Sequence, residues 1–282
     1  MNNFALVGLG YISQRHIQAI QDTGNKLLMV CDIDESKKKI VSNAIFNSNY
    51  IKMAKDPLFK EVDYVVIATP NHLHFLMVMF FLKMGKKVLC EKPLAIELEH
   101  LEILERLPMK KNLSVVLQLR YNPKIDAIKS SEEFKDIFIK VQAYREKEYW
   151  DSWKGNPELS GGILMNMGVH YIDLLIHILG EPIEILSSNY SERKAAGIIK
   201  FKNGKGTYKI EFLDNPQETV RKININGEEM DLEGATLSLK GDTTQNLHAI
   251  VYHNLNNGIP ISEARKSLDL INLLKSRRLK TI

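Results

Sequence analysis

The sequence predicts an α/β protein of two domains: a doubly wound parallel sheet over residues 1–119, then an α+β domain with a large, mostly antiparallel sheet over residues 120–282. Three observations support this fold class. Short apolar runs alternate with helical patterns in the first part, and a glycine turn follows the first run. In the second part, Asn-Gly pairs separate runs of alternating polarity.

The first domain alternates strands and helices. Apolar runs rich in Val, Ile and Leu predict strands at Phe4–Val7, Lys26–Cys31, Tyr64–Ala68, Lys87–Leu89 and Ser114–Gln118. Helical patterns lie between them at about 11–23, 35–43, 71–84 and 97–106. Gly24 and Gly85 stand where C-terminal caps are expected. Strands separated by helices of this length form βαβ units, and these build a parallel sheet covered on both faces.

The second domain changes to an antiparallel pattern. One amphipathic helix at 164–179 is stopped by Gly180. Asn203–Gly204 and Asn226–Gly227 each join two strand-like runs, and Asn-Gly supplies the positive φ angles of a type I′ turn. Two further helices are predicted at 243–256 and 262–278.

Composition limits the kind of protein and its location. The chain has 282 residues, 44% hydrophobic and 26% charged, which are ordinary values for a soluble globular protein. Its net charge of +4 would suit an anionic small molecule such as a nucleotide. Cys31 and Cys90 are isolated in apolar runs, which predicts buried reduced thiols. The N-terminus has no signal-peptide pattern, and the most apolar stretch, Phe75–Met84, is about half the length of a membrane span. We therefore expect a cytoplasmic protein that binds neither membranes nor nucleic acid.

A glycine-rich turn indicates a dinucleotide site. In FALVGLGYISQRH, Gly8 and Gly10 lie between the first strand and the first helix. Glycines there bring backbone N–H groups up to a diphosphate, as in Rossmann domains. Asp32 ends the next strand, where a carboxylate bonds the adenosine ribose hydroxyls and repels the 2′-phosphate of NADP. The sequence therefore favours NAD, while Lys37 leaves NADP open.

Further cofactor contacts are expected in the same turn and after the strand Tyr64–Ala68. These candidates are Tyr11, Ile12, Thr69, Pro70, Asn71 and His74. Loops at the carboxyl edge of a doubly wound sheet are where ligands bind. His72 and His74 lack a third ligand of metal-site type, so we expect no metal.

The next strand ends in VLCEKPL, and Glu91–Lys92–Pro93 together with the later GGILMNMGVH resembles the Gfo/Idh/MocA oxidoreductase family. The similarity runs nearly end to end. The block YWDSWKGNPELSGGILMNMGVHYIDLL is most similar to the branch of UDP-N-acetyl-2-amino-2-deoxyglucuronate 3-dehydrogenases. Relative to that branch, the stretch around 126–140 is compressed.

The resemblance implies that Lys92 and His170 are catalytic, and that Glu91 contacts the cofactor. Oxidising a secondary alcohol needs a base for its proton, and histidine titrates in the right range. Asn166 lies four residues before His170, on the same helix face, and is a substrate-binding candidate. Many relatives carry Asp there; an amide cannot accept a proton, and it would not repel a uronate. Asp173 either orients His170 or makes a structural hydrogen bond.

Other substrate contacts are expected in the second domain. Lys154 is the candidate for a sugar carboxylate or a phosphate. The aromatic residues beside it form either a substrate wall or ordinary packing: Tyr149, Trp150 and Trp153. Arg120 and Tyr121, after the last parallel strand, are weaker pocket candidates.

The implied function is NAD-dependent oxidation of the C3 hydroxyl of UDP-N-acetyl-glucosaminuronic acid, for lipopolysaccharide O-antigen or another surface polysaccharide. Relatives in this branch imply 2-oxoglutarate as a cosubstrate and assembly as a homodimer or homotetramer. One alternative is a dehydrogenase or reductase of the same family that acts on another sugar, nucleotide sugar or cyclitol. An alternative of a different class is a catalytically silent NAD-binding scaffold.

Overall fold

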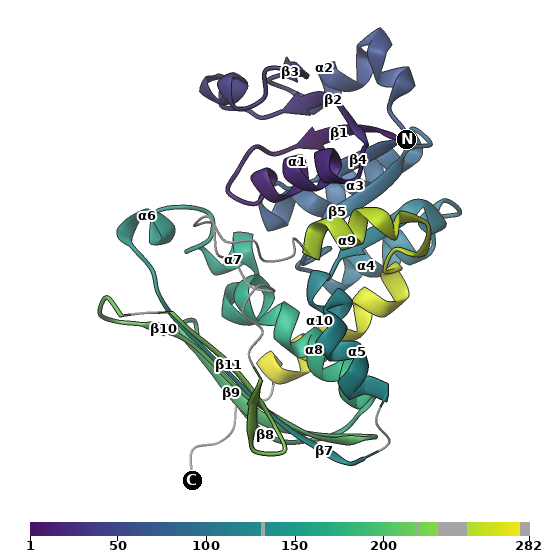
Figure 1. Cartoon of the computed structure of the whole chain (residues 1–282). Coiled ribbons are helices and arrows are strands. Elements are labelled where there is room, and N and C mark those ends of the chain that lie inside the picture. The colour runs from purple at the N-terminus through teal and green to yellow at the C-terminus, as the bar shows by residue number, and fades with distance from the viewer. Residues whose placement is uncertain (131–132, 218, 231–246, 277–282) are drawn as a thin grey trace. The chain divides into compact units, whose positions relative to one another are not determined.

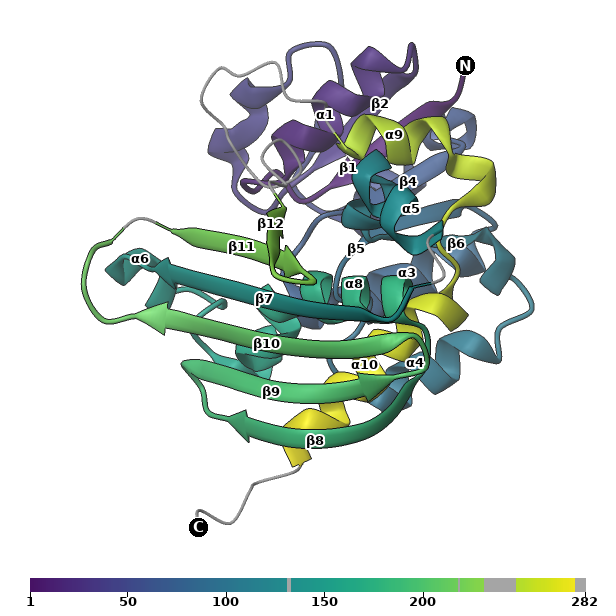
Figure 2. The same ribbon diagram turned by 60° about the horizontal axis from the view of Figure 1, so that its bottom comes forward.

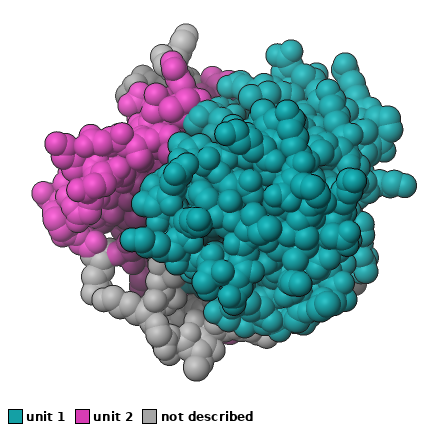
Figure 3. Space-filling view, turned by 90° about the horizontal axis from the view of Figure 1, so that it is seen from above, with its two compact units in different colours: residues 1–118, 245–262 teal, residues 119–244, 263–282 magenta. Residues whose placement is uncertain are grey.

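A computed structural model describes residues 1–130, 133–217, 219–230 and 247–276. The chain divides into two compact units (Figure 3). Unit 1 comprises Met1–Gln118 and Gln245–Ser262, and unit 2 comprises Leu119–Thr244 and Glu263–Ile282. Residues 245–262, which the sequence assigned to the second domain, group with the first unit, because helix α9 (Leu247–His253) packs against helix α1 (Ser13–Asp22).

Unit 1 contains a six-stranded parallel sheet in the order β3-β2-β1-β4-β5-β6 (Figure 1). Its strands are β1 Asn3–Val7, β2 Lys26–Cys31, β3 Ile45–Asn47, β4 Tyr64–Ile67, β5 Lys87–Glu91 and β6 Leu113–Val116. This is the doubly wound order, so the predicted fold class is confirmed. All four residues of β4 are buried, as expected for a central strand covered on both faces.

The helices of unit 1 are α1, α2 Tyr50–Lys55, α3 His74–Lys83, α4 Leu98–Glu105 and α9. Most of them lie at predicted positions with small shifts at their ends, and α2 is the exception. Gly24 and Gly85 have φ angles of 68° and 76°, so both C-terminal glycines are confirmed. Cys31 and Cys90 are buried and unpaired, and burial raises the pKa of the Cys31 thiol to about 12.

The region after β2 differs from the prediction. The expected helix over 35–43 is a short 3-10 segment, Glu35–Ile40, with no buried residue. It lacks an apolar face to pack, and tertiary packing is what stabilises most helices. Strand β3 and helix α2, which the sequence analysis did not predict, complete the crossover to β4.

Unit 2 is built on a second six-stranded sheet in the order β12-β11-β7-β10-β9-β8 (Figure 2). Its strands are β7 Lys135–Tyr144, β8 Pro182–Tyr190, β9 Lys194–Phe201, β10 Gly204–Leu213, β11 Val220–Ile225 and β12 Glu228–Met230. Only β7 and β10 pair in parallel among these described strands. The mostly antiparallel sheet is therefore confirmed.

The central strand β7 was not predicted, although its sequence alternates clearly. Ile137, Ile139 and Val141 point to one face and are buried. Helix α8 (Val169–Leu179) packs against this face, on β7 and β10. These alternating residues form a strand in a region that the sequence analysis described only as a compressed stretch at 126–140.

The two Asn-Gly pairs have different roles. Asn226 and Gly227 have φ angles of 52° and 88°, which confirms a type I′ turn between β11 and β12. Between β9 and β10 the hairpin is confirmed but its turn is not, because Gly204 is the first residue of β10 and has no positive φ. A Cβ on Gly204 would collide with the carbonyl of Lys135 on β7, so glycine permits a close approach of two strands.

The helices of unit 2 are α5 Pro123–Ser130, α6 Lys147–Trp150, α7 Pro157–Ser160, α8 and α10 Ile261–Ser276, with α10 beginning in unit 1. A π-helical turn, Leu164–Gly168, leads into α8. Within the described chain, one helical run, 157–179, is long and apolar enough to span a membrane, but 78% of its most apolar window is buried inside the fold, as in a core helix. The predicted helices at 243–256 and 262–278 extend into residues outside the described ranges.

Candidate functional site

The glycine turn between β1 and α1 has the shape required of a diphosphate cradle. Gly8 has a φ angle of 96°, and a Cβ there would lie 2.5 Å from the carbonyl oxygen of Ala68. A Cβ on Gly10 would meet nothing within 4 Å, so the space above the turn is open. No side chain caps the N-terminus of α1 at Ile12, although the N–H groups of Ser13 and Arg15 donate to the carbonyls of Gly10 and Ile12. A ligand anion would therefore compete with no capping side chain at this helix end. The turn therefore fits the diphosphate of a dinucleotide.

Asp32 directly follows β2, beside this turn. Its carboxylate accepts the N–H of Leu9 at 2.7 Å and the N–H of Asp34 at 2.9 Å, so it also fixes the shape of the turn. The ammonium of Lys37 lies 3.0 Å from the same carboxylate. This pairing reduces the repulsion that Asp32 would exert on a 2′-phosphate.

The loop after β4 places Thr69, Pro70 and Asn71 at the carboxyl edge of the sheet, at the switch point between the paired strands β1 and β4, from which the strand order runs in opposite directions. His74, at the start of α3, is buried, and burial lowers its pKa. Its Nδ1 lies 2.7 Å from the carbonyl oxygen of Pro93, and its Nε2 lies 2.8 Å from that of Thr69. His74 therefore links the loops after β4 and β5.

Glu91 ends β5 and is only 6% exposed, whereas Lys92 is half-buried. The carboxylate of Glu91 lies against two histidines that the sequence analysis did not select, His16 on α1 and His248 on α9. The ligand atoms of these three residues lie within 4.8 Å of one another, close enough for one metal ion. The two histidine contacts to Glu91 have the distances of ordinary hydrogen bonds, and these bonds account for the cluster.

In unit 2 the predicted substrate residues come from the segment that ends in α8. Asn166 lies in the π-helical turn and donates from Nδ2 to the hydroxyl of Tyr149 at 2.8 Å. His170 is half-buried in the first turn of α8. π-helical turns inside helices are frequent at functional sites.

Asp173 makes a structural contact, one of the two roles that the sequence left open. Its two oxygens accept from Nε and Nη2 of Arg120, each at 2.8 Å, and both side chains are buried. Nη1 of Arg120 donates to Glu263 at 3.1 Å. Arg120 was predicted at the substrate, but all three of its nitrogens bond carboxylates, so its geometry is that of a structural ion pair.

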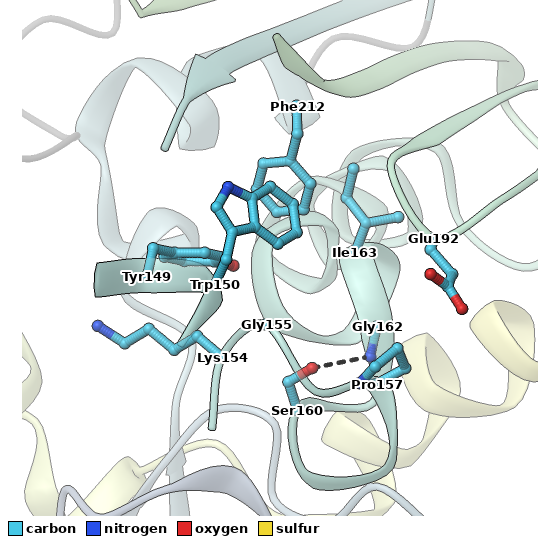
Figure 4. A pocket seen from close by; sticks show the side chains of 10 residues that line it. All are labelled: Tyr149, Trp150, Lys154, Gly155, Pro157, Ser160, Gly162, Ile163, Glu192 and Phe212. Atoms are coloured by element: carbon cyan, nitrogen blue, oxygen red, sulfur yellow. Dashed lines mark hydrogen bonds between the residues drawn. The ribbon is translucent and has the colours of Figure 1, made fainter. Parts of the chain in front are cut away.

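The aromatic residues pack on the sheet of unit 2. The rings of Tyr149 and Trp150 lie 5.5 and 5.1 Å from that of Phe212 on β10. Together with Lys154 they line a small pocket of about 20 Å³, room for about one water molecule (Figure 4). Trp153 lies beside Lys154, whose ammonium is 5.9 Å from the Trp153 ring. The aromatic cluster is thus packing that also lines this small pocket.

Three cationic side chains gather around Tyr149 and Tyr171. The guanidinium of Arg145 lies 5.3 Å from the ring of Tyr149, and the ammonium of Lys154 lies 6.0 Å from it. Arg221 on β11 bonds Tyr171 of α8. Burial, and then the charge of Arg145, lowers the pKa of Lys154. Within the described ranges, no carboxylate pairs with any of the three.

Sequence reasoning selected Lys154 but missed Arg145 and Arg221. Arg145 directly follows β7, the strand that was overlooked. Arg221 lies opposite Val141 of β7 in the antiparallel register, on the buried face. The alternation of β7 is the signal that would have placed both arginines.

Comparison with known proteins identifies the family. The Gfo/Idh/MocA model described as an oxidoreductase family with an NAD-binding Rossmann fold matches residues 2–119. The model of the same family's C-terminal alpha/beta domain matches residues 135–278. The chain belongs to the Gfo/Idh/MocA oxidoreductase family. Unit 1 thus carries the family's NAD-binding domain.

Curated relatives in the family act on several sugars and cyclitols. Glucose-6-phosphate 3-dehydrogenase of Bacillus subtilis is 27% identical over 63% of this chain and 54% of its own length. An NADP-dependent scyllo-inositol 2-dehydrogenase of the same organism is 26% identical over 75% of this chain and 67% of its own length. The chain therefore aligns with only about half to two thirds of these relatives.

A solved structure aligns more completely. The WlbA (WbpB) dehydrogenase of Thermus thermophilus, in complex with NAD and UDP-GlcNAcA, has a TM-score of 0.83 and 26% identity over 100% of this chain and 97% of its own. A second structure of that enzyme holds NAD and alpha-ketoglutarate and is 27% identical over the same coverage, again with a TM-score of 0.83.

Replacing Gly8 by Ala tests the cradle. We expect NADH affinity to fall at least about 10-fold, because the methyl group meets the Ala68 carbonyl and the positive φ disfavours a side chain. Gly24→Ala is the matched control, since Gly24 has a positive φ but open space around it. NADH fluorescence titration measures both. Equal affinities in the two variants would contradict the cradle.

Arg120→Met separates a structural from a substrate role. The variant leaves Asp173 buried without its cation, and we expect a loss of about 3–5 kcal/mol in the free energy of unfolding. Arg106→Met, at an exposed i,i+4 pair, should change it by less than about 0.5 kcal/mol. Urea denaturation gives both values. A stable Arg120→Met protein with a raised KM would instead place Arg120 at the substrate.

Proposed function

We propose that this protein uses NAD to oxidise the C3 hydroxyl of UDP-N-acetyl-glucosaminuronic acid to a 3-keto sugar. The cluster of Arg145, Lys154 and Arg221 carries the proposal, because these cations have no acidic partner in the described chain. A uronic acid linked to a nucleoside diphosphate supplies anions for such a site. The complete alignment with an enzyme crystallised with UDP-GlcNAcA supports the same substrate class.

Asn166 fits an acidic substrate better than a carboxylate would. Its amide donates to Tyr149 and adds no negative charge beside Arg145. An acid at this position would pair with the cations and would repel a uronate. Asn166 and Tyr149 therefore serve to orient sugar hydroxyls, and the cations hold the carboxylate or the diphosphate.

The proposed chemistry divides between two residues. His170 takes the proton from the C3 hydroxyl, because imidazole accepts protons near neutral pH. Lys92 is the second predicted catalytic residue, a cation of the type that stabilises negative charge developing on an oxygen. NAD, when bound, accepts the hydride. We propose that the turn at Gly8 and Gly10 holds the diphosphate of NAD and that Asp32 bonds its ribose.

Two features of the proposal concern partners. Reoxidation of the bound cofactor by 2-oxoglutarate is consistent with the Thermus structure that holds alpha-ketoglutarate. Three expectations stay predictions: self-association into a dimer or tetramer through the outer face of the unit 2 sheet, a cytoplasmic location, and a place in surface-polysaccharide synthesis.

A second candidate substrate is a sugar phosphate, since glucose-6-phosphate is the named substrate of a curated relative and is also an anion.

Substrate oxidation tests the proposal directly. Purified protein with NAD should give rising absorbance at 340 nm with UDP-N-acetyl-glucosaminuronic acid, at a kcat/KM at least about 100-fold above that for glucose-6-phosphate or scyllo-inositol. Addition of 2-oxoglutarate should then reverse the absorbance. A higher kcat/KM for another sugar would identify that sugar as the substrate. If the protein binds NADH but turns over none of the sugars, the catalytically silent scaffold is the better explanation.

Arg145→Met tests the origin of the acid preference. We expect KM for the uronate to rise about 10- to 100-fold, the loss of a charge-assisted hydrogen bond worth about 1.5–3 kcal/mol. The effect on UDP-N-acetylglucosamine, which lacks the carboxylate, should be smaller if Arg145 holds the sugar acid. Arg193→Met is the control, since Arg193 lies 4.7 Å from the Trp150 ring but pairs with Asp214. An unchanged KM in Arg145→Met would contradict the assignment.

A further inference from the structure

A buried cluster in unit 1 surrounds the residue that precedes Lys92. Glu91 at the end of β5 is bonded by His16 from α1 and His248 from α9, and Tyr252 from α9 lies behind His16. His16 is fully buried, and the other three side chains are nearly so. His248 is 157 positions from Glu91 in sequence, so the fold brings distant segments to one carboxylate.

The contacts fix where the protons lie. Nε2 of His16 is 3.0 Å from Oε1 of Glu91, and Nδ1 of His16 is 2.9 Å from the hydroxyl of Tyr252. A carboxylate only accepts, so Nε2 of His16 carries the proton and donates to Glu91. Nδ1 is then a lone pair, and the hydroxyl of Tyr252 donates to it. Nε2 of His248 donates to the same Oε1 at 3.3 Å.

The result is a buried carboxylate with two neutral neighbours, His16 and Tyr252. The ionisable groups that face the carboxylate are His16, His74, Cys90, His248 and Tyr252. Burial lowers the pKa of His16 and raises the pKa of Tyr252, so both stay neutral near pH 7. Burial alone would raise the pKa of Glu91, but the hydrogen bonds from His16 and His248 hold it well below its usual value.

This carboxylate also holds the backbone of the next residue. Oε2 of Glu91 accepts the N–H of Lys92 at 3.2 Å. On the other side, His74 contacts the carbonyl oxygen of Pro93. The peptide groups around Lys92 are therefore fixed from two directions within unit 1. Glu91, predicted to contact the cofactor, has both carboxylate oxygens occupied by donors from the protein.

We infer that His16, His248 and Tyr252 are positioning residues: they keep Glu91 as a fixed acceptor, and Glu91 orients Lys92 for the reaction. The inference rests on the role proposed above for Lys92. It makes α9 a functional part of unit 1, since two of the three positioning residues come from this helix. A buried base-and-orienter arrangement of this kind acts through geometry, and displacements near 1 Å cost about 100-fold in rate.

His248→Leu removes one hydrogen-bond donor to Glu91 and keeps a side chain of similar volume. In His248→Leu we expect kcat to fall about 10- to 100-fold with KM and NADH affinity within about twofold, because the substrate and cofactor contacts are untouched. Glu91 loses a donor and its pKa rises, so kcat should decline more steeply toward acid pH than in the wild type. His248→Gln keeps an N–H donor and should recover most of kcat and the wild-type pH profile.

Two further variants separate positioning from folding. Tyr252→Phe keeps the ring and removes the donor to His16, and we expect a fall of about 5- to 10-fold in kcat without loss of thermal stability beyond a few degrees. His253→Leu, at an exposed neighbour on α9, is the control and should behave as the wild type. Loss of kcat in step with melting temperature, without rescue by glutamine, would overturn the inference. So would a wild-type kcat and pH profile in His248→Leu.

A readout without substrate keeps this inference apart from the proposed function. Nitrogen-15 NMR of the imidazoles should show His16 as the neutral Nε2–H tautomer between about pH 6 and 8. A protonated or Nδ1–H ring for His16 would overturn the cluster whatever the enzyme does. Lys92→Met is the kinetic reference: if it turns over sugar like the wild type, the role of Lys92 fails, while the NMR result still tests the cluster.

Discussion

Each unit buries an ionised carboxylate, and the donors around that carboxylate decide which distant segments must come together. Burying a charge is costly unless hydrogen bonds replace the lost water. In unit 1, Glu91 is satisfied by hydrogen bonds from two imidazoles, His16 and His248, and from a backbone N–H. In unit 2, Asp173 is satisfied by a full cation, Arg120, which cancels its charge.

This difference suits what each carboxylate supports. The charge of Glu91 is used to hold one backbone N–H at the carboxyl edge of a parallel sheet, where loops rather than regular pairing determine position. Asp173 and Arg120 instead join the core helix α8 to the segment that opens unit 2, and Glu263 adds the C-terminal helix α10. A bidentate ion pair gives such a junction both strength and fixed geometry.

Local sequence signals were enough for the parts of the fold that depend on neighbouring residues. The glycine turn at Gly8 and the type I′ turn at Asn226 follow from backbone geometry that few residue types allow. The cluster around Glu91 could not be found this way, since nothing near His248 in sequence shows that α9 returns to unit 1. Gly204 shows the same limit: its residue type is explained by a strand that lies far away in sequence, not by the turn beside it.

The charge balance around Asn166 links the overlooked arginines to the proposed substrate. Arg145 directly follows β7 and Arg221 lies on β11, both strands of the unit 2 sheet, so the pairing between β7 and β11 sets their positions. With an amide at 166, their charges remain available for a ligand, whereas a carboxylate there would bind them internally. The proposed preference for an acidic substrate then depends jointly on the uncharged Asn166 and on the arginines of the unit 2 sheet. A change at position 166 alone is expected to shift that preference only while the arginines stay in place.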